Sequence, residues 1–274
     1  MTSYPFPVAL AWIFFPVLGA CLASFFNVLH YRMPQGLSLV RPGSHCPLCK
    51  HPIAWYHNVP VLGWLFLRGR CAHCHEPIPF RYPLVEALGG VLGFLAIYIT
   101  HPHPEATVQW VPALTLFWLL TTLIPIFVID FQHLLLPDTV TLGGIVVGLG
   151  LSIAPNGIGW LSSVLGIVFA GGGLYLVGFI ATKALKRDAM GFGDVKLLAG
   201  FGALLGAGWA AFAMIVGCFL ALLVMIPYRL YHRKTQDMAA EIPFGPFLGL
   251  GAPIAYLWGE PLVKWYLGLF GLHQ

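Results

Sequence analysis

Residues 110–129, WVPALTLFWLLTTLIPIFVI, form a run of 20 residues without a charged side chain. A helix of about 20 apolar residues is what the roughly 30 Å hydrocarbon core of a membrane requires. The whole chain of 274 residues shares this character, since 58% of its residues are hydrophobic, 9% are charged and its mean hydropathy is +0.82. We therefore predict an all-α polytopic membrane protein.

Apolar segments of similar length recur along the chain and predict about eight transmembrane helices. They lie at 8–29, 84–100, 110–129, 139–154, 160–182, 194–207, 209–228 and 245–263. The first segment lacks the basic start and small-residue end of a signal peptide, so we expect it to be retained. The segment 30–82 is rich in Pro, Gly, Cys and His and predicts a small loop domain, which divides the chain into 1–29, 30–82 and 83–274.

Basic residues predict the orientation, because Lys and Arg are retained on the cytoplasmic side of short loops. They concentrate in three loops, whereas the intervening loops 101–109 and 155–159 contain none. The basic residues are Arg32, Arg41, Lys50, Arg68, Arg70 and Arg81, then Lys183, Lys186 and Arg187, and finally Arg229, Arg233 and Lys234. Eight spans would place all three loops in the cytoplasm and both termini outside. The net charge of +4 then reflects topology and anionic lipid, with no indication of a nucleic-acid partner.

Two CxxC pairs in the loop 30–82 predict a structural zinc site. Cys46 and Cys49 form the first pair, Cys71 and Cys74 form the second, and 21 residues separate the pairs. Four thiolates at such spacing complete the tetrahedral coordination of zinc and leave no open position for a substrate. Disulfides are the alternative, but they are uncommon in the reducing cytoplasm. We therefore expect the metal to stabilise the loop.

Three acids, Glu86, Asp130 and Asp194, lie at or within the predicted ends of spans, where ionisable groups are functional candidates by default. Asp130 ends the third segment and Asp194 begins the sixth, so the expected topology places both at the cytoplasmic edge. Two neighbouring carboxylates can share one proton, so that one acts as a base toward water and the other as an acid. This arrangement would support aspartic protease chemistry.

Asp194 lies within residues 190–196, MGFGDVK. The absence of Cβ atoms at Gly191 and Gly193 would let a substrate strand or a partner helix approach beside the carboxylate. The alternatives are that Asp194 is only the N-cap of the sixth helix and that Asp130 is a solvated helix end.

Two further charged residues follow these aspartates. Asp138 comes after Pro137 and is expected to cap the fourth helix, and Lys196 is expected to contact a lipid headgroup or an acid. Glu86 is interpreted as a residue at the start of a helix.

Six stretches in order resemble the type IV prepilin peptidases, which are membrane aspartic proteases of the GxGD class. The stretches are 24–28 (SFFNV) with Arg32 and Pro34; the CxxC pairs with 58–62 (NVPVL) and 68–71 (RGRC); 81–86 (RYPLVE); 129–138 (IDFQHLLLPD); 190–198 (MGFGDVKLL); and 243–247 (PFGPF). The resemblance implies that Asp130 and Asp194 are the catalytic pair, Gly191 and Gly193 the motif glycines, and Lys196 and Asp138 supporting positions.

The same resemblance implies a substrate and a second activity. Its members cleave type IV prepilins or pseudopilins at the cytoplasmic face of the bacterial inner membrane, after the glycine that ends the basic leader. Members with a paired-cysteine loop also methylate the new N-terminus with S-adenosylmethionine, so 30–82 would serve methyl transfer and 83–274 would be the protease core. Polar positions in the matching stretches are candidates for methyl transfer, with loop packing an equal alternative. They are Asn27, Asn58, Arg70, Tyr82 and Glu86.

Two alternative functions are considered. The first is a GxGD membrane protease without methyltransferase activity. The second is a proton-coupled transporter with a zinc-binding regulatory loop, which would place acids near the middle of the membrane and show inverted repeats. Both aspartates lie instead at one edge, and no internal repeat is recognised.

Overall fold

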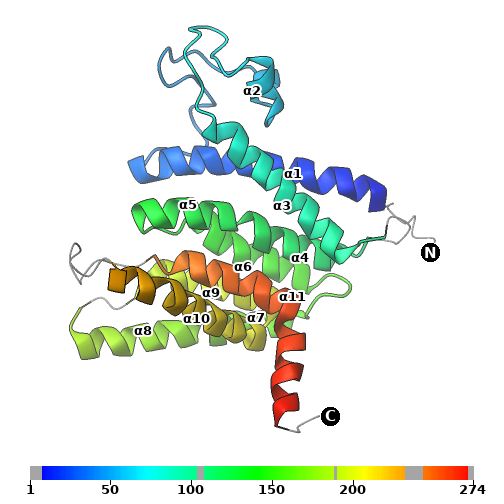
Figure 1. The fold of residues 1–274 in the computed structure, drawn as a ribbon, viewed down its shortest axis with the longest axis vertical. Helices are drawn as coiled ribbons and strands as arrows, with labels where there is room; N and C mark the ends of the chain where they lie inside the picture. Colours follow the sequence, from blue (N-terminus) through cyan, green and yellow to red (C-terminus); the bar gives the residue numbers. More distant parts are fainter. Residues whose placement is uncertain (1–7, 104–107, 188–189, 232–242, 271–274) are drawn as a thin grey trace. The chain divides into compact units, whose positions relative to one another are not determined.

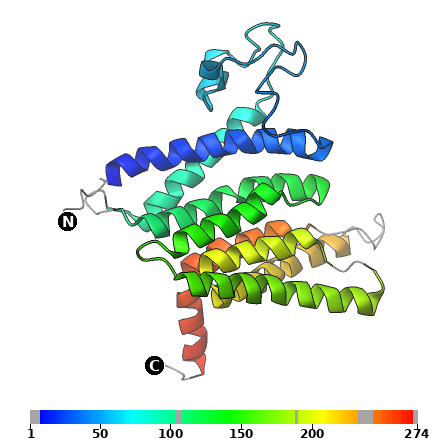
Figure 2. The same cartoon turned by 180° about the vertical axis from the view of Figure 1, so that it is seen from behind.

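The computed structural model describes residues 8–103, 108–187, 190–231 and 243–270. Both ends of the chain, and Arg233 and Lys234 of the third basic loop, lie outside these residues. The chain divides into two compact units, Met1–Pro125 and Ile126–Gln274, and each regular element in the described residues is a helix (Figures 1 and 2). The prediction of an all-α protein is therefore confirmed.

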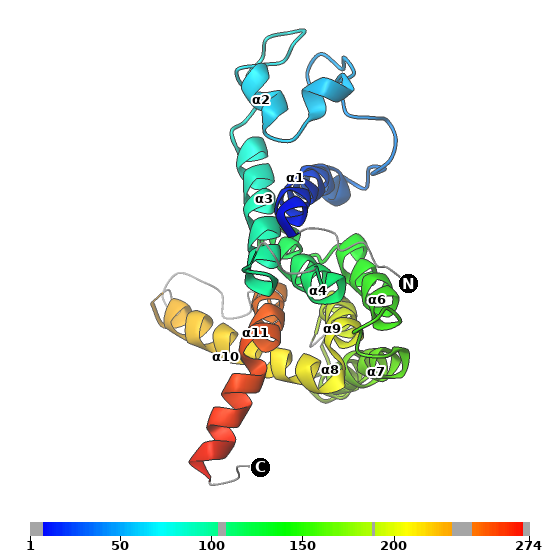
Figure 3. The same ribbon diagram turned by 90° about the vertical axis from the view of Figure 1, so that its right-hand side faces the viewer.

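Unit 1 contains three main helices, and the cysteine loop lies between the first two. The helices are α1 (Val8–Arg32), α3 (Arg81–Thr100) and α4 (Trp110–Thr121), and the loop carries the short η1 (Met33–Gln35), η2 (Trp55–Asn58) and α2 (Leu62–Phe66). A Cβ atom on Gly19 of α1 would lie 2.2 Å from the carbonyl oxygen of Gly89 of α3. Such close approach of small residues is how membrane helices associate. In Figure 3 the loop, with α2, lies beyond the N-terminal end of α3.

Unit 2 is built around one central helix. Its elements are α5 (Leu123–His133), which crosses the unit boundary, α6 (Asp138–Ser152), α7 (Trp160–Gly166), the π-helical turn η3 (Ile167–Gly171), α8 (Gly172–Leu185), α9 (Phe192–Leu205), α10 (Ala207–Tyr231) and α11 (Gly245–Leu269). Every residue of α9 from Leu197 onward is buried, and Figure 3 shows this helix among α6, α7, α8 and α10. A helix that is apolar on all sides is buried in this way.

Glycines allow this packing around α9. A Cβ atom on Gly166 of α7 would lie 2.0 Å from the carbonyl oxygen of Gly202, and one on Gly148 of α6 would lie 2.6 Å from the Cβ of Ala203. The Ser163 hydroxyl donates to the Ala203 carbonyl at 2.8 Å. The C-terminal end of α9 is thereby packed closely against α6 and α7.

All eight predicted apolar segments coincide with helices. The third is broken near Thr122 into α4 and α5, and the fifth contains the π-helical turn η3. Five helical segments are long and apolar enough to span a membrane, which makes the chain a multi-pass membrane protein. They are Val8–Gln35, Arg81–Thr100, Trp110–His133, Trp160–Leu185 and Ala207–Tyr231. For the shorter α6 and α9, and for α11, crossing of the membrane stays a prediction.

Candidate functional site

Asp130 lies in the last turn of α5 and is almost completely buried, with 5% of its surface exposed. Its Oδ2 atom accepts the backbone N–H of Gly245, the first residue of α11, at 3.1 Å. A Cβ atom on Gly245 would lie only 2.8 Å from that oxygen. The close contact of α11 with the aspartate therefore favours a glycine at position 245. Gly245 lies in the stretch PFGPF, which was noted for its resemblance, but Gly245 was not predicted to be a site residue.

Asp194 is half-buried and stands one turn inside α9. The N-cap of α9 is Gly191, which makes no side-chain capping bond, and the N–H of Asp194 donates to the Gly191 carbonyl at 3.2 Å. The alternative that Asp194 is the N-cap is therefore wrong, because the extended backbone of Gly191 starts the helix three residues earlier. The carboxylate is left available for another role.

Asp138 is also not a cap. Pro137 occupies the N-cap position of α6 without a side-chain capping bond, and Asp138 is the first helical residue. Its carboxylate instead forms an ion pair with the ammonium of Lys196, which lies 5.5 Å from the ring centroid of Phe192. Of the two contacts expected for Lys196, the structure contains the one with an acid. The pair connects the start of α6 to the first turn of α9.

Leu136 connects the surroundings of the two aspartates. A Cβ atom on Gly193 would lie 3.0 Å from the Cβ of Leu136, and one on Gly245 would lie 2.9 Å from the Cδ2 of Leu136. The end of α5, the start of α9 and the start of α11 therefore meet around Leu136, and these helix ends carry Asp130 and Asp194.

The two motif glycines have different surroundings. Gly193 is needed for close approach of Leu136, as the distance above shows. At Gly191 a Cβ atom would have, among the residues that the structure describes, only the Oδ2 of Asp194 nearby, at an ordinary contact distance of 3.5 Å. The space beside Gly191 is thus next to the Asp194 carboxyl group and suits the approach of another chain.

The four loop cysteines form one cluster in unit 1. The Sγ atoms of Cys46, Cys49, Cys71 and Cys74 all lie within 4.8 Å of one another, and those of Cys46 and Cys74 are 3.8 Å apart. All four cysteines are free, which contradicts the alternative that they form disulfides. Tetrahedral zinc with Zn–S bonds of about 2.3 Å requires sulfur atoms roughly 3.8 Å apart. The cluster therefore has the ligands and the spacing to hold a zinc ion.

The cluster is formed by two copies of the same turn, which we call the first knuckle (44–53) and the second knuckle (69–78). The N–H of Cys46 donates to the His51 carbonyl at 3.0 Å, and the N–H of Cys71 donates to the Glu76 carbonyl at 2.9 Å. The two segments, SHCPLCKHPI and GRCAHCHEPI, share the pattern CxxCxxPI. The prediction that the chain has no internal repeat was therefore wrong. The shared CxxCxxPI pattern in the sequence indicates this short repeat.

One cysteine of each knuckle, Cys46 and Cys71, is favoured as the thiolate, whereas burial and the neighbouring thiols raise the pKa of Cys74 to about 12. Backbone N–H groups of Cys74 and His73 lower the pKa of the Cys71 thiol to about 6, and that of Cys49 lowers the pKa of Cys46. Thiolate is the form that binds zinc. The rings of His51 and His73 stack with centroids 4.4 Å apart, which joins one knuckle to the other.

Side chains of α1 and α3 hold the loop. The Oε2 atom of Glu86 accepts the N–H of Val61 at 2.7 Å and so supports a backbone with φ of 63°, which a β-branched residue rarely adopts. The amide of Asn27 donates to the Tyr82 carbonyl at 3.3 Å. Glu86 therefore has the loop-packing contact that was one of the two alternatives for it, and Asn27 connects α1 to the first turn of α3.

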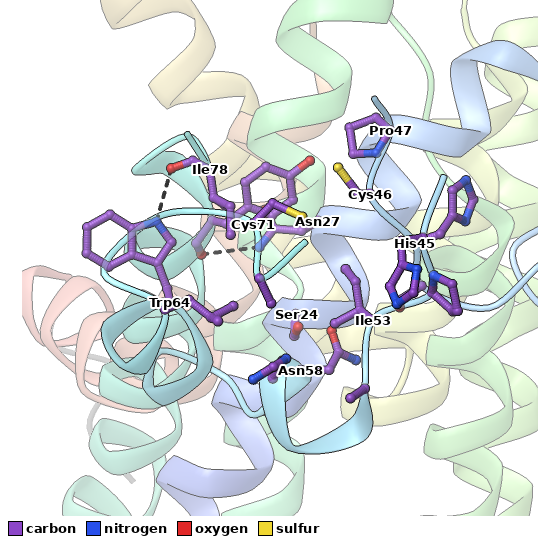
Figure 4. Close-up of a pocket in the computed structure, with 18 of the residues that line it drawn as sticks. Ser24, Asn27, His45, Cys46, Pro47, Ile53, Asn58, Trp64, Cys71 and Ile78 are labelled. Carbon is purple, nitrogen blue, oxygen red and sulfur yellow. Dashed lines mark hydrogen bonds between the residues drawn. The ribbon is translucent and has the colours of Figure 1, made fainter. Parts of the chain in front are cut away.

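A cavity of about 430 Å³ lies between this loop, α1 and the start of α3 (Figure 4). Of the five polar positions considered for methyl transfer, four line it and Arg70 does not. The four are Asn27, Asn58, Tyr82 and Glu86.

Comparisons with known proteins agree along most of the chain. Residues 17–100 match the bacterial peptidase A24 N-terminal domain, and residues 113–226 match the type IV leader peptidase family. The chain is 36% identical over 261 residues to the prepilin leader peptidase/N-methyltransferase of Myxococcus xanthus, a match that covers 92% of this chain and 74% of that protein. The protein of the same name from Aeromonas hydrophila is 35% identical over 298 residues, with 95% and 96% covered. No solved structure matches the chain.

Proposed function

Because the chain belongs to the type IV leader peptidase family, we propose that it removes the basic leader of type IV prepilins or pseudopilins and then methylates the new N-terminus. The observation that supports the peptidase half is that Gly245 contacts Asp130 and that Leu136 lies against both Gly245 and Gly193, the residue before Asp194. Each carboxyl group comes from a different helix, so the site forms only when unit 2 is folded.

The two aspartates would divide the work of peptide hydrolysis. One carboxylate takes a proton from water as the oxygen attacks the peptide carbonyl, and the protonated partner donates to the carbonyl oxygen and later to the leaving amine. Asp130 is oriented by the N–H of Gly245, and Asp194 is half-buried and open to the space beside Gly191. This asymmetry supports a substrate strand that enters past Gly191.

The methyltransferase half belongs in our proposal to the loop 30–82 and its neighbouring helices, and 83–274 contains the protease core. Zinc held by Cys46, Cys49, Cys71 and Cys74 would stabilise the loop, which buries few of its own side chains. The names of the relatives imply a methyl donor for those proteins, and we propose that S-adenosylmethionine is the donor here.

We further propose that the protein resides in the bacterial inner membrane with both sites facing the cytoplasm. The basic residues of the loops support this orientation and contact with anionic headgroups. A prepilin whose basic leader remains in the cytoplasm would then present its cleavage site at the depth of the aspartates.

The peptidase assignment is tested by neutralising each carboxylate without changing its shape. Asp130→Asn and Asp194→Asn should each lower prepilin cleavage by about 100-fold or more, because each removes one partner of an acid–base pair. Both variants should still methylate a pilin that already lacks its leader. Glu260→Gln, an exposed carboxylate on α11, is the matched control.

Cleavage at the wild-type rate by either aspartate variant would refute the pair. Label from S-adenosylmethionine distinguishes the alternative of a protease without methyltransferase activity, because that protein would cut the precursor and transfer nothing.

A further inference from the structure

The cavity beneath the cysteine loop has no role in the proposed proteolysis, which takes place in unit 2. Its volume of about 430 Å³ falls within the roughly 300–1,000 Å³ typical of small-molecule sites. Figure 4 shows Ser24 and Asn27 of α1, Cys46, Ile53 and Asn58 of the first knuckle and its continuation, and Cys71 of the second knuckle around it. Both zinc-ligand pairs thus contribute to its wall.

Two buried side chains of opposite charge line this cavity, Arg32 with 8% and Glu86 with 9% of their surface exposed. The guanidinium of Arg32 donates to the carbonyls of Ser38 at 3.0 Å and Gly43 at 3.3 Å. Glu86 accepts the N–H of Val61. Within the part of the chain that the structure describes, neither side chain has an oppositely charged partner. Buried charges without counter-ions are unfavourable, and a ligand that carries both charges would compensate them.

The remaining lining suits a planar heterocycle with polar edges. Tyr56, His57 and Tyr82 offer aromatic faces, and Asn27 and Asn58 offer carboxamides that both donate and accept. A zwitterionic amino acid joined to a nucleoside has this combination of groups. The cavity therefore matches one ligand class in charge, polarity and size.

We propose that this cavity is the binding site for S-adenosylmethionine, with its amino-acid end between Arg32 and Glu86. Arg32 binds the donor carboxylate through its remaining N–H groups, and Glu86 compensates the positive charge of the donor. The assignment rests on the proposed methyltransferase function. The assignment also gives the zinc knuckles a second role, because they hold the outer wall of the donor site in place.

Methyl transfer needs no reactant other than the donor, the N-terminal amine and water. The lone pair of the new N-terminal amine attacks the methyl carbon, the bond between that carbon and sulfur breaks, and the sulfur keeps the bonding pair as a neutral thioether. The methylated amine has gained one bond and releases a proton to water.

Direct binding measurements on the purified full chain test the site. Glu86→Gln keeps an oxygen that can accept the N–H of Val61 and removes only the charge, so the loop contact is preserved. The affinity for S-adenosylmethionine should fall about 10- to 100-fold, as expected for loss of a charged hydrogen-bond partner. Adenosine, which lacks the amino acid, should bind the variant as it binds the wild type. Glu260→Gln is the control, and unchanged prepilin cleavage by Glu86→Gln shows that the protein is folded.

A photoreactive azido analogue of S-adenosylmethionine provides a second measurement that needs no variant. Its label should map to peptides between residues 24 and 86. Unchanged affinity of Glu86→Gln, or label confined to unit 2, would overturn the site while wild-type methyl transfer persists. A wild-type protein that neither binds the donor nor transfers label would refute the methyltransferase function itself.

Discussion

Replacing Gly245 by alanine is expected to disable proteolysis while the fold survives. The added Cβ would lie 2.8 Å from the Oδ2 of Asp130 and 2.9 Å from the Cδ2 of Leu136. Both atoms are the ends of side chains, so they can move aside at a cost of about 1–3 kcal/mol in the free energy of unfolding. The Asp130 carboxyl group cannot stay where it accepts the Gly245 N–H.

A catalytic group displaced by about 1 Å costs roughly 100-fold in rate. We therefore expect kcat/KM for prepilin cleavage to fall about 100-fold in Gly245→Ala, with only a small decrease in Tm. Gly173→Ala is the matched control, because a Cβ atom at this helical glycine of α8 would meet no other element of the described residues within 4 Å. Its cleavage rate should match that of the wild type.

The result that would refute this reasoning is cleavage by Gly245→Ala within about threefold of the Gly173→Ala rate. Gly245 would then have no part in positioning Asp130. A third value, the rate of methyl transfer to a pre-cleaved pilin, should be unchanged in both variants, since that reaction is assigned to unit 1.

Two further predictions concern charges and metal. Chelation of zinc, or Cys46→Ser, should release the metal and abolish methyl transfer while cleavage persists. The reason is that the knuckles line the cavity and do not contact the aspartates. Metal analysis with both activity assays checks this, and a parallel loss of cleavage would contradict it. Lys196→Met should lower the free energy of unfolding by less than about 1 kcal/mol, because its pair with the exposed Asp138 is solvated. Denaturation at low and high salt checks this, and a larger loss would show that the pair holds α6 against α9.

Much of the fold could be predicted because the transfer of an apolar run into a membrane depends on the run itself. Residues 110–129 need no partner to favour a bilayer, and the helices α4 and α5 occupy that stretch. The CxxC spacing likewise predicts a metal cluster, since each pair forms within a single turn. The shared CxxCxxPI pattern is also local and was visible in the sequence.

Helix ends and caps were predicted less well. Asp194 and Asp138 were both considered as N-caps, yet Gly191 and Pro137 occupy those positions. The start of a helix depends on competition between local capping and the packing of its first turn. In α9 that packing involves Leu136 beside Gly193 and Asp138 paired with Lys196, and both Leu136 and Asp138 come from outside the helix.

The sequence by itself determined that this protein belongs in a membrane, where its helices lie, and which side chains are candidates for catalysis and metal binding. Only the tertiary structure decided how these groups are combined. The N–H of Gly245 reaches Asp130 across 115 positions of the chain, and the N–H of Val61 reaches Glu86 across 25. Hydrophobic transfer is a property of each segment, whereas such contacts exist only after helices with complementary small residues have packed.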